Sequence, residues 1–315
     1  MKIERLLLAT DFSGWAGRAQ DYACSLAATW QAHLTVMTVL EFPPGLNPDY
    51  PVNHQYLAHR MGEATEQLAD FKQRASRRGI TVATRIATGI PSEEINVAAQ
   101  AEDSDLIIVG TRGKTGLAHV LLGSTAERVI RTAPCPVLAV HMAKDEPSGE
   151  RGVCLERILV PIDFSDCSLD ALEYAALVAK QAKASIALLH VLEPVSYGLD
   201  FTLSHTEEQM QRRERLTKRL EELSSALSAT GITVTSHLRG GIPVDSILDD
   251  VRSLRSDLVV MGTHGRRGLS HVMAGSVAEA LLRRATCAVL TVRSPKFRPG
   301  HHRVVSALSI HSMNP

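Results

Sequence analysis

A long internal repeat constrains the fold of this chain more than any other feature of its sequence. Residues of the second half match residues of the first at a constant offset of 152 positions, so that Asp163 matches Asp11 and Gly262 matches Gly110. The same offset relates further pairs: Pro91 and Pro243, Gly123 and Gly275, His119 and His271, Glu127 and Glu279, and Cys135 and Cys287. Two domains that were alike only in composition would give scattered offsets, so we infer that one domain is present twice.

The length of the chain agrees with two domains. Domains commonly have about 100–200 residues, and 315 residues accommodate two such cores. A charged segment with Pro147 and Gly149 separates the copies, which is typical of a short linker. We therefore expect a first domain over residues 1–147, a second over 148–294, and a C-terminal tail over 295–315 that matches nothing in the first copy.

Short apolar runs alternate with segments of helical periodicity along each copy. In the first copy we expect strands over 5–10, 34–40, 80–86, 105–109 and 137–140, and helices over 17–29, 55–77, 92–101 and 124–131. This alternation predicts an α/β fold: two tandem Rossmann-like, doubly wound domains, each with a five-stranded, mostly parallel sheet flanked by helices.

Polar and glycine-rich segments follow two of the predicted strands. Asp11 and Asp163 end the first strand of each copy, and the segments GTRGKTG (110–116) and GTHGRRG (262–268) follow the fourth. Ligands of doubly wound sheets bind at the carboxyl ends of the strands, where the strand order reverses. We therefore expect these segments to meet at one rim of each domain.

Each copy contains the same glycine motif, in which Gly, two residues, Gly and nine residues precede Gly-Ser. Glycine lets the main chain approach a phosphate closely, and the start of a helix offers unpaired N–H donors to an anion. The motif therefore predicts a phosphate site, with hydroxyls from Ser124 and Ser276 and main-chain donors from Thr125 and Val277. Its members are Gly110, Gly113, Gly123 and Ser124 in the first copy, and Gly262, Gly265, Gly275 and Ser276 in the second.

A capping box is an alternative explanation for part of this motif. Ser124 with Glu127, and Ser276 with Glu279, have the spacing at which serine caps a helix and glutamate reaches back to the serine N–H. Capping accounts for the serine and the glutamate but not for three spaced glycines, so we favour the phosphate site.

The basic residues of the glycine-rich segments differ between the copies. Arg112 is replaced by His264, and residues 114–115, Lys-Thr, correspond to residues 266–267, Arg-Arg. We count Arg112 and His264 among the candidate contacts and expect the two phosphate sites to be unequal.

On these motifs the chain resembles the universal stress protein family in its tandem form, over nearly the whole of both halves. The resemblance rests on both glycine motifs and on three pairs of segments: TDFS (10–13) and IDFS (162–165), TVLE (38–41) and HVLEP (190–194), and DLIIVGT (105–111) and DLVVMGT (257–263). Ala9 is a small departure, because proline is the commoner family residue there. The resemblance implies an adenine-nucleotide-binding α/β domain that usually dimerises, and the glycine spacing marks the ATP-binding group.

The family's site residues carry over to matching positions of this chain. The resemblance places Asp11 and Asp163 beside the base or ribose, Val39 and Val191 against the adenine, and the glycine motifs around ribose and phosphates. The implied cofactor is ATP, with Mg²⁺ only as the companion of its phosphates, because no acidic pair suited to a dedicated metal site is present.

Motifs of several enzyme classes are missing from the sequence. We find no GxxxxGK followed by Ser or Thr, no GxSxG, no HExxH and no GxGxxG. We therefore expect no enzyme but a nucleotide-binding protein that acts in stress response or signalling. A slow ATPase or phosphotransferase, and a nucleotide-free scaffold that acts through protein contacts, remain alternatives. His119 and His271 are expected on a helix surface.

Charge and composition argue against two classes of partner, nucleic acids and membranes. Basic and acidic residues number 34 each and aromatic residues make up 4%, which argues against a nucleic-acid surface. No apolar segment is long enough to span a membrane, and the N-terminus does not resemble a secretion signal. Five cysteines without a CxxC pair suit the cytoplasm.

The apolar terminal strands 137–140 and 289–292 are expected to pair. Family members commonly pair through this region, so the resemblance implies an intrachain pseudo-dimer and a homo-oligomer built on it. We also expect a protein partner that the sequence does not identify.

Overall fold

The computed structural model describes residues 2–41, 50–113, 122–141, 152–193, 204–263 and 275–293. They belong to two compact units. Unit 1 comprises Met1–Cys154 and Ala288–Thr291, and unit 2 is built on Leu155–Cys287. The expected domain boundary after residue 147 and the tail 295–315 lie outside the described residues.

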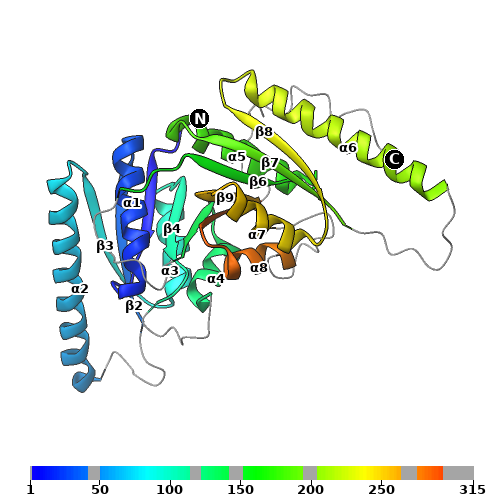
Figure 1. Ribbon diagram of the computed structural model, residues 1–315. Helices are drawn as coiled ribbons and strands as arrows, with labels where there is room; N and C mark the ends of the chain where they lie inside the picture. Colours follow the sequence, from blue (N-terminus) through cyan, green and yellow to red (C-terminus); the bar gives the residue numbers. More distant parts are fainter. Residues whose placement is uncertain are drawn as a thin grey trace. The chain divides into compact units, whose positions relative to one another are not determined.

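Unit 1 alternates strands and helices along the chain (Figure 1). Its elements are β1 (Arg5–Ala9), the short 3-10 helix η1 (Gly14–Ala16), α1 (Gly17–Trp30), β2 (His33–Leu40), α2 (Pro51–Arg77), β3 (Val82–Thr88), α3 (Pro91–Ala101), β4 (Leu106–Gly110), α4 (Ser124–Thr132) and β5 (Val137–Val140). The order confirms the predicted alternation.

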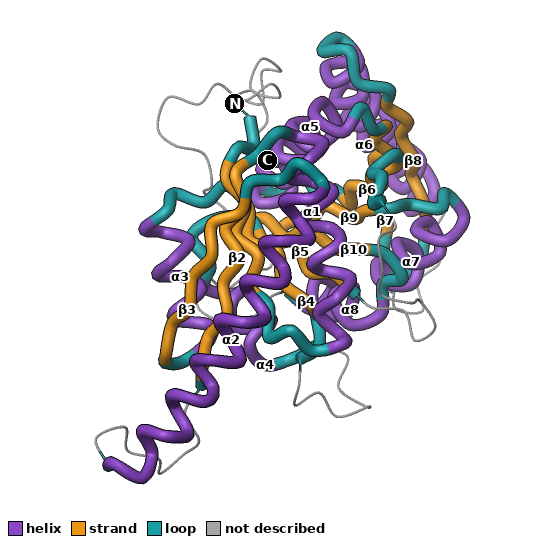
Figure 2. The backbone as a smooth tube through the Cα atoms, turned by 90° about the vertical axis from the view of Figure 1, so that its left-hand side faces the viewer, coloured by secondary structure: helices purple, strands orange, loops and turns teal. Residues whose placement is uncertain are grey.

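The sheet of unit 1 has the strand order β3-β2-β1-β4-β5, and all of these neighbours are parallel. Right-handed crossovers place α1 and α2, which lead from β1 out to β3, on one face, and α3 and α4 on the other (Figure 2). The chain changes direction between β1 and β4. The carboxyl ends of these two strands therefore form the switch point at which a ligand site is expected.

A sixth strand completes the sheet of unit 1. β10 (Ala288–Val292) comes from the end of the second sequence copy and lies antiparallel to β5, with Val289 opposite Ala139 and Thr291 opposite Val137. The expected pairing of the two terminal strands is therefore confirmed.

Unit 2 repeats the same plan. Its elements are β6 (Arg157–Pro161), α5 (Asp166–Ala182), β7 (Ser185–Leu192), α6 (Ser204–Ser228), β8 (Val234–Gly240), α7 (Pro243–Ser253), β9 (Leu258–Gly262) and α8 (Ser276–Arg284). Its strand order is β9-β6-β7-β8, again parallel. Ala9 pairs with Met37 in unit 1 and Pro161 with Leu189 in unit 2, so the 152-residue offset holds in the sheet register as well.

Central strands of both units are apolar on both faces, as parallel strands covered by helices must be. Leu6, Leu7 and Leu8 of β1 are fully buried. One carboxylate fixes the start of this strand, because Asp105 Oδ2 accepts hydrogen bonds from the backbone N–H groups of Glu4 (2.8 Å) and Arg5 (2.9 Å). Unit 2 repeats this contact through Asp257 Oδ2.

Two elements of unit 1 begin more than one residue from their predicted positions. α2 starts at Pro51 instead of residue 55, because proline is well suited to the first turn of a helix. β3 runs over Val82–Thr88 instead of 80–86, since Gly79, with φ of 73°, reverses the chain and Ile80 N–H still bonds to Ala75 O of the preceding helix. No helix in the described part of the chain combines the length and apolar character needed to cross a bilayer.

Candidate functional site

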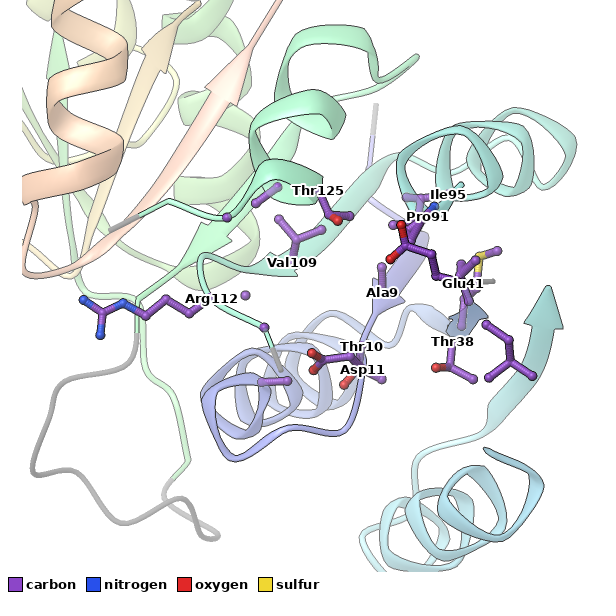
Figure 3. A pocket seen from close by; sticks show the side chains of 18 of the residues that line it. Ala9, Thr10, Asp11, Thr38, Glu41, Pro91, Ile95, Val109, Arg112 and Thr125 are labelled. Atoms are coloured by element: carbon purple, nitrogen blue, oxygen red, sulfur yellow. The ribbon is translucent and has the colours of Figure 1, made fainter. Parts of the chain in front are cut away.

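A cavity of about 330 Å³ opens at the carboxyl ends of β1, β2 and β4 of unit 1 (Figure 3). Its walls come from these strand ends, from α2 and α3, and from the start of α4. It lies at the predicted switch point of the sheet, and its size falls at the lower end of the range of about 300–1,000 Å³ that is usual for small-molecule sites.

The structure brings together every candidate site residue of the first copy. All of them line this one cavity: Asp11, Val39, Gly110, Arg112, Gly113, Gly123, Ser124 and Thr125. They come from four separate segments of the chain, three of which follow or end strands of the parallel sheet, while the fourth begins α4.

Asp11 occupies a tight turn immediately after β1. Its Oδ1 accepts a hydrogen bond from Ser13 N–H at 3.0 Å, and Phe12 between them has φ of 56°. Asp11 is not a helix cap, because Ser13 is the N-cap residue of η1 and Ala16 that of α1. The carboxylate is thus held by its own turn on the cavity wall (Figure 3).

The three glycines of the motif differ in how much space a side chain would have at each position. A Cβ atom on Gly113 would lie 2.8 Å from Asp11 Oδ2, whereas on Gly110 and Gly123 its nearest neighbour would be 3.4 Å away. Only at Gly113 does the local geometry forbid a side chain without movement of the carboxylate. Gly123 is fixed by another contact, since its N–H bonds to Thr111 O at 2.7 Å.

The start of α4 faces the cavity with unpaired donors. Gly123 is the N-cap residue, so Ser124 is the first residue inside the helix, and the first intrahelical bond runs from Glu127 N–H to Gly123 O. The N–H groups of residues 124–126 precede that bond and have no carbonyl partner within the helix. An anion in the cavity would meet these donors and the positive end of the helix dipole.

The capping-box alternative for the serine is therefore wrong in both copies. Gly123 and Gly275 occupy the N-cap positions of α4 and α8, and a glycine has no side chain with which to cap. Both serines are instead the first residues of their helices. Capping therefore does not explain why both copies have a serine directly after this glycine.

Arg112 reaches the cavity with its main chain but not with its guanidinium. Figure 3 shows the side chain directed away from Asp11 and Thr125, and the guanidinium carbon lies 5.0 Å from the ring centroid of Trp15. This cation–π contact keeps the positive charge at the Trp15 ring.

Helix α2 contributes a wall that we did not predict. Arg60, Glu63 and Gln67 line the cavity at helical spacing, and Arg60 Nη1 donates to Glu63 Oε2 at 2.8 Å. The helical period of residues 55–77 could have indicated that these three share a face. Their position over the strand ends depends on the packing of α2 against β2 and β3, which sequence spacing does not reveal.

Two threonines beside the strand ends were also missed. Thr10 and Thr38 line the cavity, and Thr10 Oγ1 accepts hydrogen bonds from Phe12 N–H (3.1 Å) and Gln20 Nε2 (3.2 Å). Both residues stand inside motifs that we had already quoted, the segments 10–13 and 38–41.

Unit 2 carries the corresponding residues on corresponding elements. Asp163 follows β6, and its Oδ1 accepts from Ser165 N–H (3.0 Å) and Ser165 Oγ (2.6 Å). The other candidates within the described residues are Val191 on β7, Gly262 at the end of β9, and Gly275, Ser276 and Val277 at the start of α8. His264 and Gly265 lie outside the described residues, as do residues 114–115 and 266–267 and both His119 and His271.

A dedicated metal site has no support in the described residues. Among them, no group of three or more His, Cys, Asp or Glu side chains is arranged to hold a metal ion.

Comparison with known proteins gives one family for both halves. The profile of the universal stress protein family matches residues 2–141 and again residues 155–293. A universal stress protein of Mycolicibacterium smegmatis is 25% identical over 295 residues, which covers 91% of this chain and 96% of the relative. Universal stress protein MJ0531 of Methanocaldococcus jannaschii is 33% identical over 144 residues, 45% of this chain and 85% of the relative.

The fold recurs in a solved structure of the same tandem length. The crystal structure of a universal stress protein from Archaeoglobus fulgidus superimposes with a TM-score of 0.69, and the match covers 93% of this chain and 97% of that one. The two sequences are 24% identical, so this similarity concerns the fold alone.

Proposed function

Because the chain belongs to the universal stress protein family, we propose that it is a nucleotide-binding protein that holds ATP, or another adenine nucleotide, in the cavity of unit 1. The single observation that carries this proposal is the convergence of Asp11, Val39 and the complete glycine motif of the first copy on that cavity. One solved member of the family is a universal stress protein in complex with cAMP, so nucleotides are ligands within the family.

The residues of the cavity divide into a base and ribose end and a phosphate end. Val39 offers an apolar contact to the base, and the Asp11 carboxylate can accept hydrogen bonds from ribose hydroxyls. At the other end, the main-chain N–H groups at the start of α4 and the hydroxyls of Ser124 and Thr125 can donate to phosphate oxygens. Gly113 leaves the space that the Asp11 carboxylate needs.

These groups suit binding better than hydrolysis. The chain has no lysine and hydroxyl paired as in a P-loop to polarise the terminal phosphate, and the Arg112 guanidinium is engaged with the Trp15 ring. The proposed role is therefore that of a nucleotide-dependent stress-response or signalling factor, whose bound nucleotide alters its contacts with a protein partner. Its cytoplasmic location and its association into homo-oligomers are part of this proposal.

Analysis of released nucleotide tests the proposal and its alternatives. The purified full chain is denatured, and the supernatant is separated by ion-exchange chromatography before and after incubation with Mg²⁺. Bound ATP that persists through the incubation supports the nucleotide-dependent binding protein. Prompt conversion to ADP would instead indicate a slow ATPase, and the absence of nucleotide, also after incubation with ATP, would favour the scaffold.

Calorimetry with matched variants tests the assigned site. Asp11→Ala should weaken ATP binding at least about tenfold, which corresponds to about 1.4 kcal/mol. Asp70→Ala is the control, because Asp70 is an exposed residue of α2 outside the cavity and its removal changes the net charge equally. Equal affinities of the two variants would contradict the assignment of Asp11.

A further inference from the structure

The two units carry different side chains at matched positions of the cavity wall. In unit 1, Thr38 of β2 and Gln67 of α2 line the cavity. At the same positions unit 2 has His190 of β7 and Arg219 of α6, again at an offset of 152. A small hydroxyl side chain and a neutral amide are thus replaced by an imidazole and a guanidinium, both of them larger.

The main chain around these positions is the same in both units, so the comparison is one of side chains. In unit 1, Thr10 N–H bonds to Met37 O at 2.9 Å, and in unit 2, Ile162 N–H bonds to Leu189 O at 2.8 Å. Phe12 and Phe164 follow with φ of 56° and 63°. The turn after the first strand therefore presents its phenylalanine in the same backbone conformation in each unit.

In unit 2 the larger side chains form a packed stack. The rings of Phe164 and His190 lie 5.0 Å apart between centroids, and the guanidinium carbon of Arg219 lies 4.1 Å from the centroid of Phe164. His190 is only 7% exposed, and its Nδ1 is 2.6 Å from Ile162 O. Because a carbonyl only accepts hydrogen bonds, this nitrogen is the donor, and the ring is fixed against the end of β6.

A third difference between the units adds bulk beside the stack. Ala64 of α2 lines the cavity of unit 1, and the matched residue of α6 in unit 2 is Leu216, which is 8% exposed. Unit 2 therefore carries a larger side chain than unit 1 at each of these three positions. Entry of a base there would require Arg219 to leave the Phe164 ring and His190 to give up a buried hydrogen bond.

From these contacts we infer that unit 2 excludes the base of a nucleotide through the Phe164, His190 and Arg219 stack, and that the chain binds one nucleotide, in unit 1. This inference rests on the proposed function. Unit 2 keeps Gly262, Gly275 and Ser276 at its phosphate end, so its glycine motif alone does not distinguish the two units. His190 and Arg219 are the residues that set this difference.

Binding stoichiometry is the direct test. The full chain is stripped of nucleotide and equilibrated by dialysis against radiolabelled ATP with Mg²⁺, and bound ATP is counted per chain at saturation. We expect one ATP per chain. Two per chain would overturn the inference and leave the proposed function standing, whereas no binding would overturn both.

Exchange variants test whether the named side chains cause the exclusion. His190→Thr with Arg219→Gln gives unit 2 the residues of unit 1 at the two positions that set the difference, and binding should rise from one to two ATP per chain. Arg213→Gln, a change of the same type at an exposed residue of α6, should leave it at one. A double variant that folds, as judged by circular dichroism, and still binds one ATP would overturn the inference.

The reciprocal exchange is made in unit 1, so it tests the inference even if the variants of unit 2 do not fold. Gln67→Arg with Thr38→His brings the side chains of unit 2 into unit 1, and ATP binding should fall at least tenfold. Thr38 is buried, so Gln67→Arg alone, at a partly exposed helix position, is measured in parallel and should lower the affinity in the same direction. Unchanged affinity in both variants would contradict the inference.

Discussion

Gly113 and Asp11 are placed so that a Cβ atom on the glycine would lie 2.8 Å from Oδ2 of the aspartate. The two residues follow β4 and β1, the neighbouring strands at which the chain reverses its direction across the sheet. Ligands of doubly wound sheets bind at such a point. The glycine motif and the aspartate therefore line one cavity, and the position of the aspartate carboxylate requires a glycine at residue 113.

Gly113→Ala should weaken ATP binding without unfolding the protein. The added methyl group meets a side-chain oxygen and not the backbone, so the carboxylate can rotate away, but it then leaves the position proposed for contact with the ribose. We expect a loss of affinity of about tenfold, equal to about 1.4 kcal/mol, measured by calorimetry.

Gly62→Ala is the matched control for that change. Gly62 lies within α2, and a Cβ atom there meets nothing within 4 Å. Alanine is a better helix former than glycine by about 1 kcal/mol, so this variant should melt at a slightly higher temperature and bind ATP normally. Equal ATP affinities of the two glycine variants would show that Gly113 is not part of the nucleotide site.

The same substitution at one repeated position should have unequal effects in the two units. A Cβ atom on Gly262 would lie 2.8 Å from Cys167 Sγ and 2.9 Å from Cys167 backbone atoms, whereas on Gly110 it would lie 3.4 Å from its nearest neighbour. Overpacking of this kind costs about 1–3 kcal/mol. Gly262→Ala should therefore lower the free energy of unfolding of nucleotide-free protein, measured in urea, and Gly110→Ala should change it much less.

Two serines at matched positions also differ in how much they contribute to the stability of the fold. Ser165 caps α5, because its Oγ accepts from Ser168 N–H and donates to Asp163. The matched Ser13 makes no cap hydrogen bond, and its buried Oγ finds no partner among the described residues. Ser165→Ala should destabilise the protein by about 1 kcal/mol, while Ser13→Ala should stay within about 0.5 kcal/mol of the parent. Equal losses in urea unfolding would contradict this account.

Much of the fold followed from the sequence because its signals are local. Apolar runs such as residues 105–109 predict buried parallel strands, and the constant offset extends each assignment to the second unit. A capping box was an alternative for the start of α4 because Ser124 and Glu127 have the right spacing. The spacing is the same whether the cap is Ser124 or Gly123, and only the backbone conformation decides between them.

The candidate site was predicted less completely than the fold. Asp11, Val39 and Gly110 are found at strand ends, where topology alone brings them together. Arg60, Glu63 and Gln67 reach the cavity only because α2 packs across the strand ends, a contact between segments distant in the sequence. The direction of the Arg112 side chain likewise depends on Trp15, with which it has no sequence relationship.

The cysteine thiols should differ in reactivity according to how deeply each is buried. Burial, with a smaller contribution from the nearby Asp257 carboxylate, raises the pKa of Cys287 to about 12, and burial also raises the pKa of Cys24. The thiolate is the reactive form, and a group with pKa about 12 is ionised in only about one molecule in ten thousand at pH 8. Cys154 is exposed, so iodoacetamide at pH 8 should modify it first, as followed by peptide mass spectrometry. Labelling of Cys287 should appear only in urea, or as the pH rises towards its pKa. Modification of Cys287 in the folded protein as fast as that of Cys154 would contradict the burial of its thiol, and Cys154→Ser provides the background for measuring it.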